Sequence, residues 1–255
     1  TDLINAPFRP FNSKEVVEAM SPATKASSYP GLDDKAIVRL WKTKGIQASV
    51  QGTAVHTVID KWLKHGTPYT GVDWQPEWTA FQQFMANAAA ARWEVFKTEA
   101  SIVYENTHNQ VLITGQPDLI LRQRDENNKW RYAVVDWKRS DFHKGPVFHN
   151  AEAPGFTHLP DTKLYRNSMQ AYLYRYILRR RYNLNIAEDD VFLVGLHPDA
   201  PCIPSVVEGV LRNSPPIPNL AREVRLLVDR LDDMKTRVRL AVAVRDSERG
   251  WLRRV

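Results

Sequence analysis

The sequence predicts an α/β protein with a mixed central β-sheet flanked by helices. Residues 52–64 carry Val55, Val58, Ile59, Trp62 and Leu63 at the spacing of one buried helix face. Residues 99–138 are rich in the β-branched and aromatic side chains that are typical of strands. A second helical pattern at 163–182 precedes another strand-like segment at 191–197. Helices and strands therefore alternate along the chain, as they do in α/β folds.

The N-terminal part is predicted to be helical after an irregular arm. Residues 1–31 contain four prolines that interrupt short apolar pieces, so this arm is expected to lack regular structure. Helical spacing starts within residues 33–41, and residues 76–97 read as a long helix with an alanine-rich middle. Residues 32–97 are thus expected to form a helical part that carries His56.

Three strands are predicted next, at 99–105, 111–122 and 131–138. The polar segment 125–129 lies between the last two strands, which predicts that they pair antiparallel. Residues 142–162 contain glycines and prolines without periodicity, and a loop of this length is usually functional or mobile.

The remaining elements complete a single domain over residues 1–255. After the helix 163–182 we expect strands at 191–197 and 205–211, then a basic amphipathic helix at 218–246. Residues 98–212 would form the core of this domain and residues 213–255 a C-terminal helical extension.

Composition limits the class of protein. The chain has 255 residues, 43% hydrophobic and 25% charged, which is ordinary for a globular protein. One cysteine, Cys202, excludes an internal disulfide framework and a four-cysteine zinc or iron–sulfur site within the chain. No apolar run approaches the roughly 20 residues that a membrane span needs, and the N-terminus lacks the features of a signal peptide. We therefore expect an intracellular protein with no membrane partner, and the absent initiator methionine suggests a piece of something longer. The net charge of +6 is compatible with a nucleic-acid partner and equally with a solvated basic surface.

The segment 115–138 carries the most informative chemistry. In a strand, residues i and i+2 share a face, so Asp136 and Lys138 project together while Trp137 points the opposite way. A carboxylate and an ammonium at the end of a buried strand need a partner or a metal. Asp118 on the neighbouring strand would add a second carboxylate, which suits Mg²⁺ or Mn²⁺. The alternative is a surface ion pair at the end of a strand.

Two helices add polar groups to predicted apolar faces. His56 lies at the edge of the buried face of 52–64 and can point into a cleft, or it is a satisfied boundary histidine. Gln170 and Tyr174 are one helical turn apart and share a face. They either serve the site or form the polar boundary of a packed helix.

The order of these motifs resembles the PD-(D/E)XK nuclease superfamily, in the branch typified by the exonuclease domain of RecB. The resemblance rests on Gly52-x-x-x-His56, a glutamate on a strand, Gly115-x-x-Asp118, Asp136-x-Lys138 and Gln170-x-x-x-Tyr174, which together cover about half the chain. Because the iron–sulfur cysteines of many relatives are absent, the chain is similar to the cluster-free members.

The resemblance implies a role for each matching residue. Asp118, Asp136 and His56 would bind metal, with Glu99 and the Trp137 carbonyl as further ligands.

Lys138 would be the catalytic lysine, with Gln170 and Tyr174 supporting it and contacting DNA. Lys163, Arg166 and Lys144 flank this inferred site in the sequence and either bind phosphates or are ordinary surface charges.

The implied activity is a metal-dependent DNA nuclease with one or two Mg²⁺ or Mn²⁺ ions and no iron–sulfur cluster. The resemblance favours an exonuclease or end-trimming enzyme of replication, recombination or repair. Its substrate would be single-stranded DNA or duplex ends, with a helicase or a replication or recombination complex as a further partner. Two alternatives stay open, a catalytically silent nucleic-acid-binding or assembly module of a larger complex and a nuclease that prefers RNA.

Overall fold

The computed structural model describes residues 2–106, 109–143, 147 and 149–252, with side chains for all of these except Asp2 and 237–252. The helices are α1 (Asp2–Asn5), α2 (Ser13–Ala19), α3 (Pro22–Ser28), α4 (Asp34–His65), α5 (Gln75–Ala90), α6 (Lys163–Tyr182) and α7 (Ala221–Leu252). The strands are β1 (Glu94–Thr98), β2 (Ile102–Glu105), β3 (Val111–Gly115), β4 (Leu119–Arg124), β5 (Trp130–Lys138), β6 (Val191–Gly195), β7 (Ser205–Val207) and β8 (Val210–Arg212).

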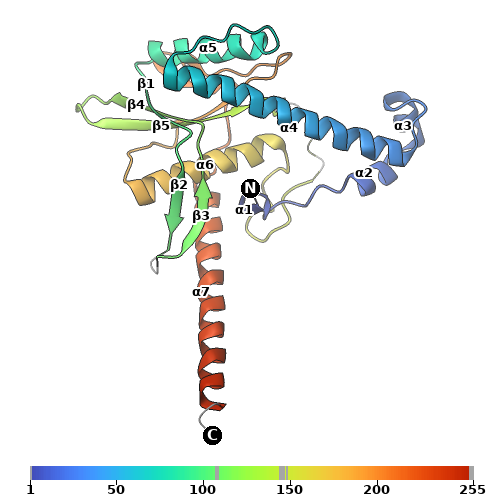
Figure 1. Ribbon diagram of the computed structural model, residues 1–255, viewed down its shortest axis with the longest axis vertical. Helices are drawn as coiled ribbons and strands as arrows, with labels where there is room; N and C mark the ends of the chain where they lie inside the picture. Colours follow the sequence, from blue (N-terminus) through green and yellow to red (C-terminus); the bar gives the residue numbers. More distant parts are fainter. Residues whose placement is uncertain (1, 107–108, 144–146, 148, 253–255) are drawn as a thin grey trace.

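A four-stranded sheet in the order β1–β4–β5–β6 forms the centre of the protein (Figure 1). The β1–β4 and β4–β5 pairs are antiparallel, whereas β5 and β6 are parallel, so the sheet is mixed as predicted. The turn between β4 and β5 is closed by Asp125, whose Oδ1 accepts hydrogen bonds from the backbone N–H groups of Asn127 and Lys129. This confirms the predicted antiparallel pairing of those two strands.

Helices cover both faces of the sheet. Helices α4 and α5 lie over one face and α6 over the other (Figure 1). The alternation along β5 matches these layers, because Val134 packs in the core on the α6 side while Val135 and Trp137 pack in the core on the α5 side. The same alternation decides which side chains of β5 can reach the candidate site.

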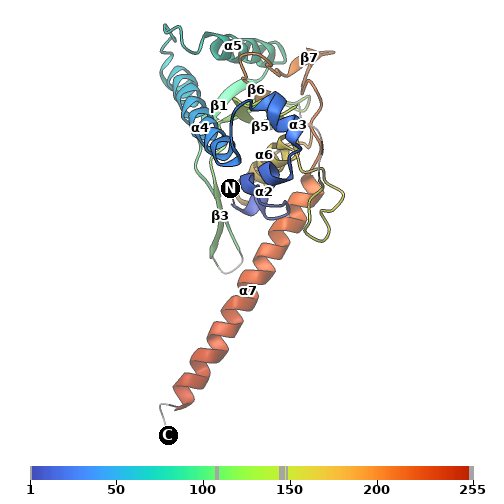
Figure 2. The same ribbon diagram turned by 90° about the vertical axis from the view of Figure 1, so that its right-hand side faces the viewer.

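Helix α7 begins on the body and then extends away from it (Figure 2). Its first turns bury Val224, Leu227 and Val228 in the core that α6 shares. Helix α7 matches the predicted C-terminal helix, although the apolar positions expected beyond residue 236 lie outside the described side chains.

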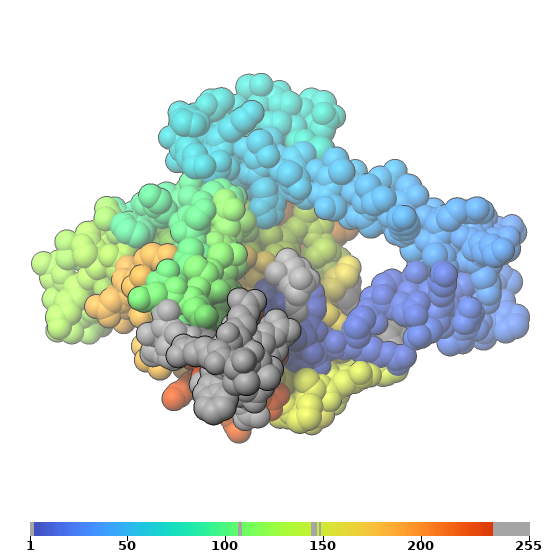
Figure 3. Space-filling model, turned by 60° about the horizontal axis from the view of Figure 1, so that its bottom comes forward, coloured from blue at the N-terminus to red at the C-terminus, as the bar shows by residue number. Residues whose placement is uncertain are grey.

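Helix α4 is one continuous helix of 32 residues. Asp33 caps its start by accepting a hydrogen bond from the Ala36 N–H at 2.6 Å, and Gly66 ends it with φ 64°, in the left-handed region that glycine tolerates. Its first half runs out to α2 and α3, and Figure 3 shows an opening between this half, the N-terminal segment and the body of the protein.

Several predicted boundaries were wrong. The helix predicted at 76–97 ends at Ala90, and residues 94–98 form β1, because they pair with β4. The strand predicted at 111–122 is divided by residues 116–118, where Pro117 has no N–H to donate to a ladder. The strand predicted at 99–105 starts only at Ile102, so Glu99 lies in a bend with φ 45° rather than on a strand.

Two further expectations also need correction. The arm at 1–31 contains the three short helices α1 to α3, since Asn12 and Ser21 cap helix starts that the prolines had obscured. The strand predicted at 205–211 is a β7–β8 hairpin that turns at Glu208 and Gly209, which both have positive φ. Among the described residues, no helix has both the length and the apolar character needed to cross a membrane.

We expect Phe81→Ala to destabilise the protein strongly. The Phe81 ring is fully buried and packs edge-on against Trp62 and Trp137, at 5.3 and 5.6 Å between ring centroids, so it connects α4, α5 and β5. Removing a buried phenyl ring typically costs about 3–5 kcal/mol of unfolding free energy. Urea denaturation would measure the loss. Phe11→Ala is the control because Phe11 is 73% exposed, and an equal loss in both variants would contradict the assignment of this core.

Candidate metal and catalytic site

Asp118 lies where α4, the start of β4 and the end of β5 meet. Its Oδ1 is 3.0 Å from Nδ1 of His56 on α4. Its Oδ2 accepts a hydrogen bond of 2.6 Å from the backbone N–H of Trp137 on β5. Asp118 is buried, with 7% of its surface exposed, so both oxygens are held by the protein. One carboxylate thus fixes the position of His56 relative to β5.

The turn before Asp118 explains the predicted Gly115-x-x-Asp118 motif. A Cβ atom on Gly115 would lie 2.6 Å from the ring of Tyr174, so only glycine lets α6 approach β3 this closely. The carbonyl of Asp118 also accepts the N–H of Glu99 at 3.0 Å, which brings the bend after β1 against the start of β4. The motif therefore positions residues from three separate segments.

His56, Glu99 and Asp118 form a group that could hold a metal ion. One ligand atom from each residue lies within 4.8 Å of the others. Divalent first-row transition metals bind to sets of one imidazole nitrogen and two carboxylates. Mg²⁺ prefers the carboxylate oxygens among these ligands. This group, here called the metal-ligand cluster, confirms that the predicted residues His56, Glu99 and Asp118 lie together.

Within the described part of the chain, Asp136 lies outside the metal-ligand cluster, and its role as a metal ligand stays a prediction. Its Oδ2 lies 2.8 Å from Nζ of Lys138, so the carboxylate is used in an ion pair. Both side chains leave β5 on the α6 side, as the alternation predicts, and Trp137 points the opposite way into the core.

Lys138 also contacts polar side chains of α6. Its Nζ donates to Oε1 of Gln170 at 2.8 Å, and Nε2 of Gln170 donates to the hydroxyl of Tyr174 at 2.9 Å. Each of these predicted residues therefore contacts the next one. We call the set the lysine chain, and its members are Asp136, Lys138, Gln170 and Tyr174. The spacing of four on α6 places the amide and the phenol on one face, which confirms that they share a surface.

Burial and neighbouring charges set the protonation states of the lysine chain. Burial raises the pKa of Asp136 well above its usual value, although the charge of Lys138 opposes this shift. For Lys138, burial alone would lower the pKa, but the charge of Asp136 and its hydrogen bond outweigh burial and raise it. Lys138 is therefore a cation at neutral pH, suited to holding a water or a phosphate oxygen by hydrogen bonds. Burial also raises the pKa of Tyr174, which keeps the phenol protonated.

Burial and neighbouring charges shift the pKa values of two residues in the metal-ligand cluster. Burial lowers the pKa of His56, but the hydrogen bond to Asp118 and its charge outweigh that effect and raise it. Burial and the charge of Asp118 raise the pKa of Glu99. Glu99 is thus less acidic than usual, and Asp118 is held by His56 and by the N–H of Trp137. Both effects are expected where carboxylates lie close together.

The residues predicted to bind phosphate have different surroundings. Lys163 is exposed at the start of α6. Arg166 forms an ion pair with Asp161 at 2.8 Å and donates to Oδ1 of Asn5 at 2.6 Å. The guanidinium of Arg166 therefore holds the N-terminal segment, and the phosphate contacts of Lys163 and Arg166 stay predictions. Lys144 lies outside the described residues.

One contact beside the site was not anticipated. Arg139 follows Lys138 and donates 2.8 Å hydrogen bonds to Glu77 on α5 and to Gln51 on α4. Glu77 is only 2% exposed, so this buried ion pair ties both helices to the end of β5. No spacing in the sequence indicates the contact, because its three residues are far apart along the chain.

The raised pKa of His56 predicts a pH-dependent contribution to stability. A histidine whose folded-state pKa exceeds its usual 6.5 stabilises the folded state below that value, and the contribution is lost as pH rises through the folded-state pKa. His56→Gln should therefore cost more unfolding free energy at pH 6 than at pH 9 in EDTA, measured by urea denaturation. His65→Gln, at the exposed end of α4, corrects for replacing any histidine. An equal cost of His56→Gln at both pH values would contradict the His56–Asp118 pair.

Comparison of the chain with protein-family models, with curated proteins and with solved structures gave no significant match.

Proposed function

We propose that this protein is a metal-dependent nuclease that hydrolyses phosphodiester bonds in DNA. The observation that carries the proposal is the close approach of two groups of side chains around β5, the metal-ligand cluster and the lysine chain. They adjoin at Asp118, whose Oδ2 accepts a hydrogen bond of 2.6 Å from the backbone N–H of Trp137, the residue between Asp136 and Lys138. Metal-assisted hydrolysis of a phosphodiester uses these two kinds of group, a site for a cation and a hydrogen-bond donor beside it.

The metal-ligand cluster would hold the ion through His56, Glu99 and Asp118. A divalent cation bound there would polarise the scissile phosphate and lower the pKa of a bound water. Asp118 keeps the imidazole of His56 in one orientation through the 3.0 Å contact. The backbone N–H of Trp137 also donates to Asp118, so the orientation of His56 is fixed relative to strand β5 and not relative to a loop.

Lys138 would hold the attacking water and offset charge on the phosphate. Among the described residues, Asp136 and Gln170 use two of its three ammonium N–H groups, and the third can hold a water or a phosphate oxygen. The raised pKa of Lys138 favours this cationic role over proton abstraction. Gln170 and Tyr174 keep the ammonium in place from α6.

The charges of helix α4 are consistent with a polyanionic substrate. Between residues 35 and 59 it carries four basic side chains and no acidic one, and it leads directly to His56. The basic residues are all exposed, and they are Lys35, Arg39, Lys42 and Lys44. This half of α4 borders the opening in Figure 3, so a phosphate backbone can approach the site along a positively charged helix.

The preference for DNA and for strand ends rests on the resemblance to the RecB-like branch of the PD-(D/E)XK superfamily. The order of the motifs and the contacts among their residues support that assignment. A preference for RNA would appear as faster cleavage of RNA than of DNA in direct competition.

Lys138→Ala should abolish DNA cleavage without preventing folding. Loss of the ammonium removes the donor beside the phosphate, and such losses typically cost on the order of 10²–10³ in rate. A time course on end-labelled single-stranded and double-stranded DNA, with Mg²⁺, Mn²⁺ or EDTA, measures the effect. Lys129→Ala, in the exposed β4–β5 turn, is the matched control and should cleave like wild type.

The same time course separates the alternatives. Metal-dependent cleavage that survives in Lys138→Ala would contradict the assigned site. If wild type binds DNA without cleaving it in either metal, the protein is a silent binding module instead.

Glu99→Gln should raise the metal concentration needed for half-maximal activity about tenfold or more. The amide replaces a charged ligand of the metal-ligand cluster and leaves the lysine chain untouched. The matched control is Glu126→Gln, whose carboxylate is exposed in the β4–β5 turn. Thermal unfolding with increasing Mn²⁺ provides a readout that does not depend on activity, and an unchanged Mn²⁺ response in Glu99→Gln would remove Glu99 from the ligand set.

A further inference from the structure

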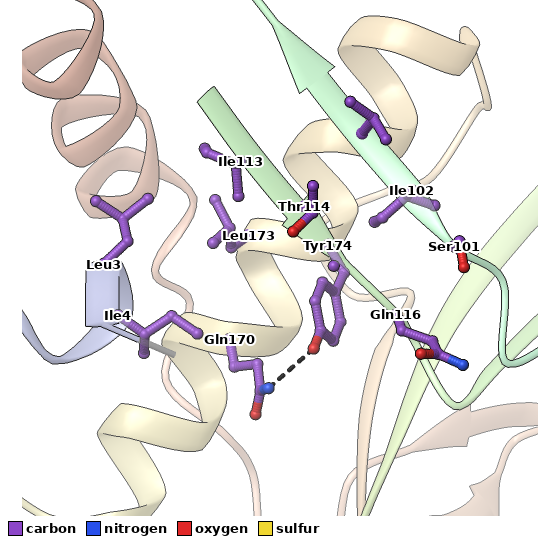
Figure 4. A pocket seen from close by; sticks show the side chains of 12 residues that line it. Leu3, Ile4, Ser101, Ile102, Ile113, Thr114, Gln116, Gln170, Leu173 and Tyr174 are labelled. Atoms are coloured by element: carbon purple, nitrogen blue, oxygen red, sulfur yellow. Dashed lines mark hydrogen bonds between the residues drawn. The ribbon is translucent and has the colours of Figure 1, made fainter. Parts of the chain in front are cut away.

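A pocket of about 520 Å³ lies beside the lysine chain (Figure 4). It is bounded by α1, by the β2–β3 hairpin and by α6, which are far apart in the sequence. Its volume falls in the range of about 300–1,000 Å³ that small-molecule sites occupy. The pocket is therefore large enough for a nucleobase with its sugar.

The lining of the pocket is neutral. Aliphatic side chains from all three elements form its walls, among them Ile4, Ile113 and Leu173. The polar groups are hydroxyls and amides, from Ser101, Thr114, Gln116, Gln170 and Tyr174, and none of the described residues that line the pocket carries a charged side chain. A phosphate would be poorly solvated there, whereas a base presents flat apolar faces and hydrogen-bonding edges.

The pocket shares two residues with the lysine chain. Gln170 and Tyr174 line it, and the dashed line in Figure 4 marks the hydrogen bond between them. The other end of the Gln170 amide accepts from Lys138, so an occupant of the pocket lies one side chain away from the ammonium. A neutral group in the pocket would therefore have its attached phosphate close to Lys138.

The N-terminal wall of the pocket is held in place by Arg166. This residue donates to Asn5 and to the carbonyl of Arg9, and its guanidinium lies 4.5 Å from the centre of the Phe8 ring. These contacts fix the segment that follows Leu3 and Ile4. The wall is thus built into the fold, which favours a formed binding site over an accidental gap.

We propose that this pocket binds the nucleobase and sugar adjoining the phosphate that is cleaved. The inference rests on the proposed nuclease function and adds to it the position of the nucleoside. Rotatable hydroxyls and amides at the edges can pair with any base, so the pocket reads the presence of a base rather than its identity. The phosphate stays outside, between Lys138 and the metal-ligand cluster.

Filling the pocket should separate binding of the nucleoside from hydrolysis of the phosphodiester. Thr114→Trp places a large ring in the pocket from an exposed position of β3, and Ser101→Trp does so from the segment before β2. Val111→Trp is the matched control, because Val111 lies on the same strand, is 56% exposed and does not line the pocket. The two substrates are a DNA oligonucleotide and bis(4-nitrophenyl) phosphate, a phosphodiester without base or sugar.

In both pocket variants, we expect KM for DNA to rise at least tenfold more than KM for bis(4-nitrophenyl) phosphate. Val111→Trp should show no such difference. Saturation-transfer NMR with 2′-deoxyadenosine, which has no phosphate, should give a signal with wild type and with Val111→Trp. That signal should fall at least tenfold in the two pocket variants.

Two results would overturn the proposal that this pocket binds a nucleoside. One is a DNA KM that does not change in either pocket variant, and the other is an equal deoxyadenosine signal in all four proteins. Failure of wild type to hydrolyse either substrate would refute the nuclease proposal instead. The nucleoside experiment would then decide by itself whether the pocket accepts a base.

Discussion

The candidate site depends on one buried carboxylate that is bonded on both sides. Asp118 faces His56 through one oxygen and accepts the Trp137 N–H through the other. A buried carboxylate is costly unless donors satisfy it, so these contacts also hold α4 and β5 at a fixed separation. Removing either donor would leave the charge uncompensated, which is why the site and the packing of α4 on the sheet cannot be treated as independent features.

Strand β5 combines a structural and a chemical role through its period of two. On one face it buries Val135 and Trp137 beneath α5, and on the other it presents Asp136 and Lys138 towards α6. The aromatic packing around Trp137 makes the strand rigid, so the two charged groups are presented from a fixed backbone. Burying this ion pair costs solvation free energy, and the fold compensates with the amide of Gln170 and the phenol of Tyr174.

Under the proposed function, different surfaces around β5 would recognise different parts of a polynucleotide. The exposed basic residues of α4 lead to His56. Asp136 and Lys138 project from β5 towards α6, where Lys138 contacts Gln170, and the neutral pocket borders Gln170 and Tyr174 beyond them. This arrangement fits the chemistry of a nucleotide, in which a charged phosphate is joined to a neutral base and sugar. The contacts of Arg166 hold the N-terminal wall of that pocket.

The sequence by itself determined the features that depend on local periodicity, namely the extent of a regular helix and the residues that share one face of a strand. The helix at 163–182 was predicted with its correct bounds, and alternation along 131–138 placed Asp136 and Lys138 on one face. Only the tertiary structure decided which side chains meet. Residues 94–98 became a strand because they pair with β4, and the bend that follows brings Glu99 to His56 and Asp118. Spacing along a chain fixes neighbours within one element, whereas contacts between elements depend on how whole segments pack, and no short-range pattern encodes that packing.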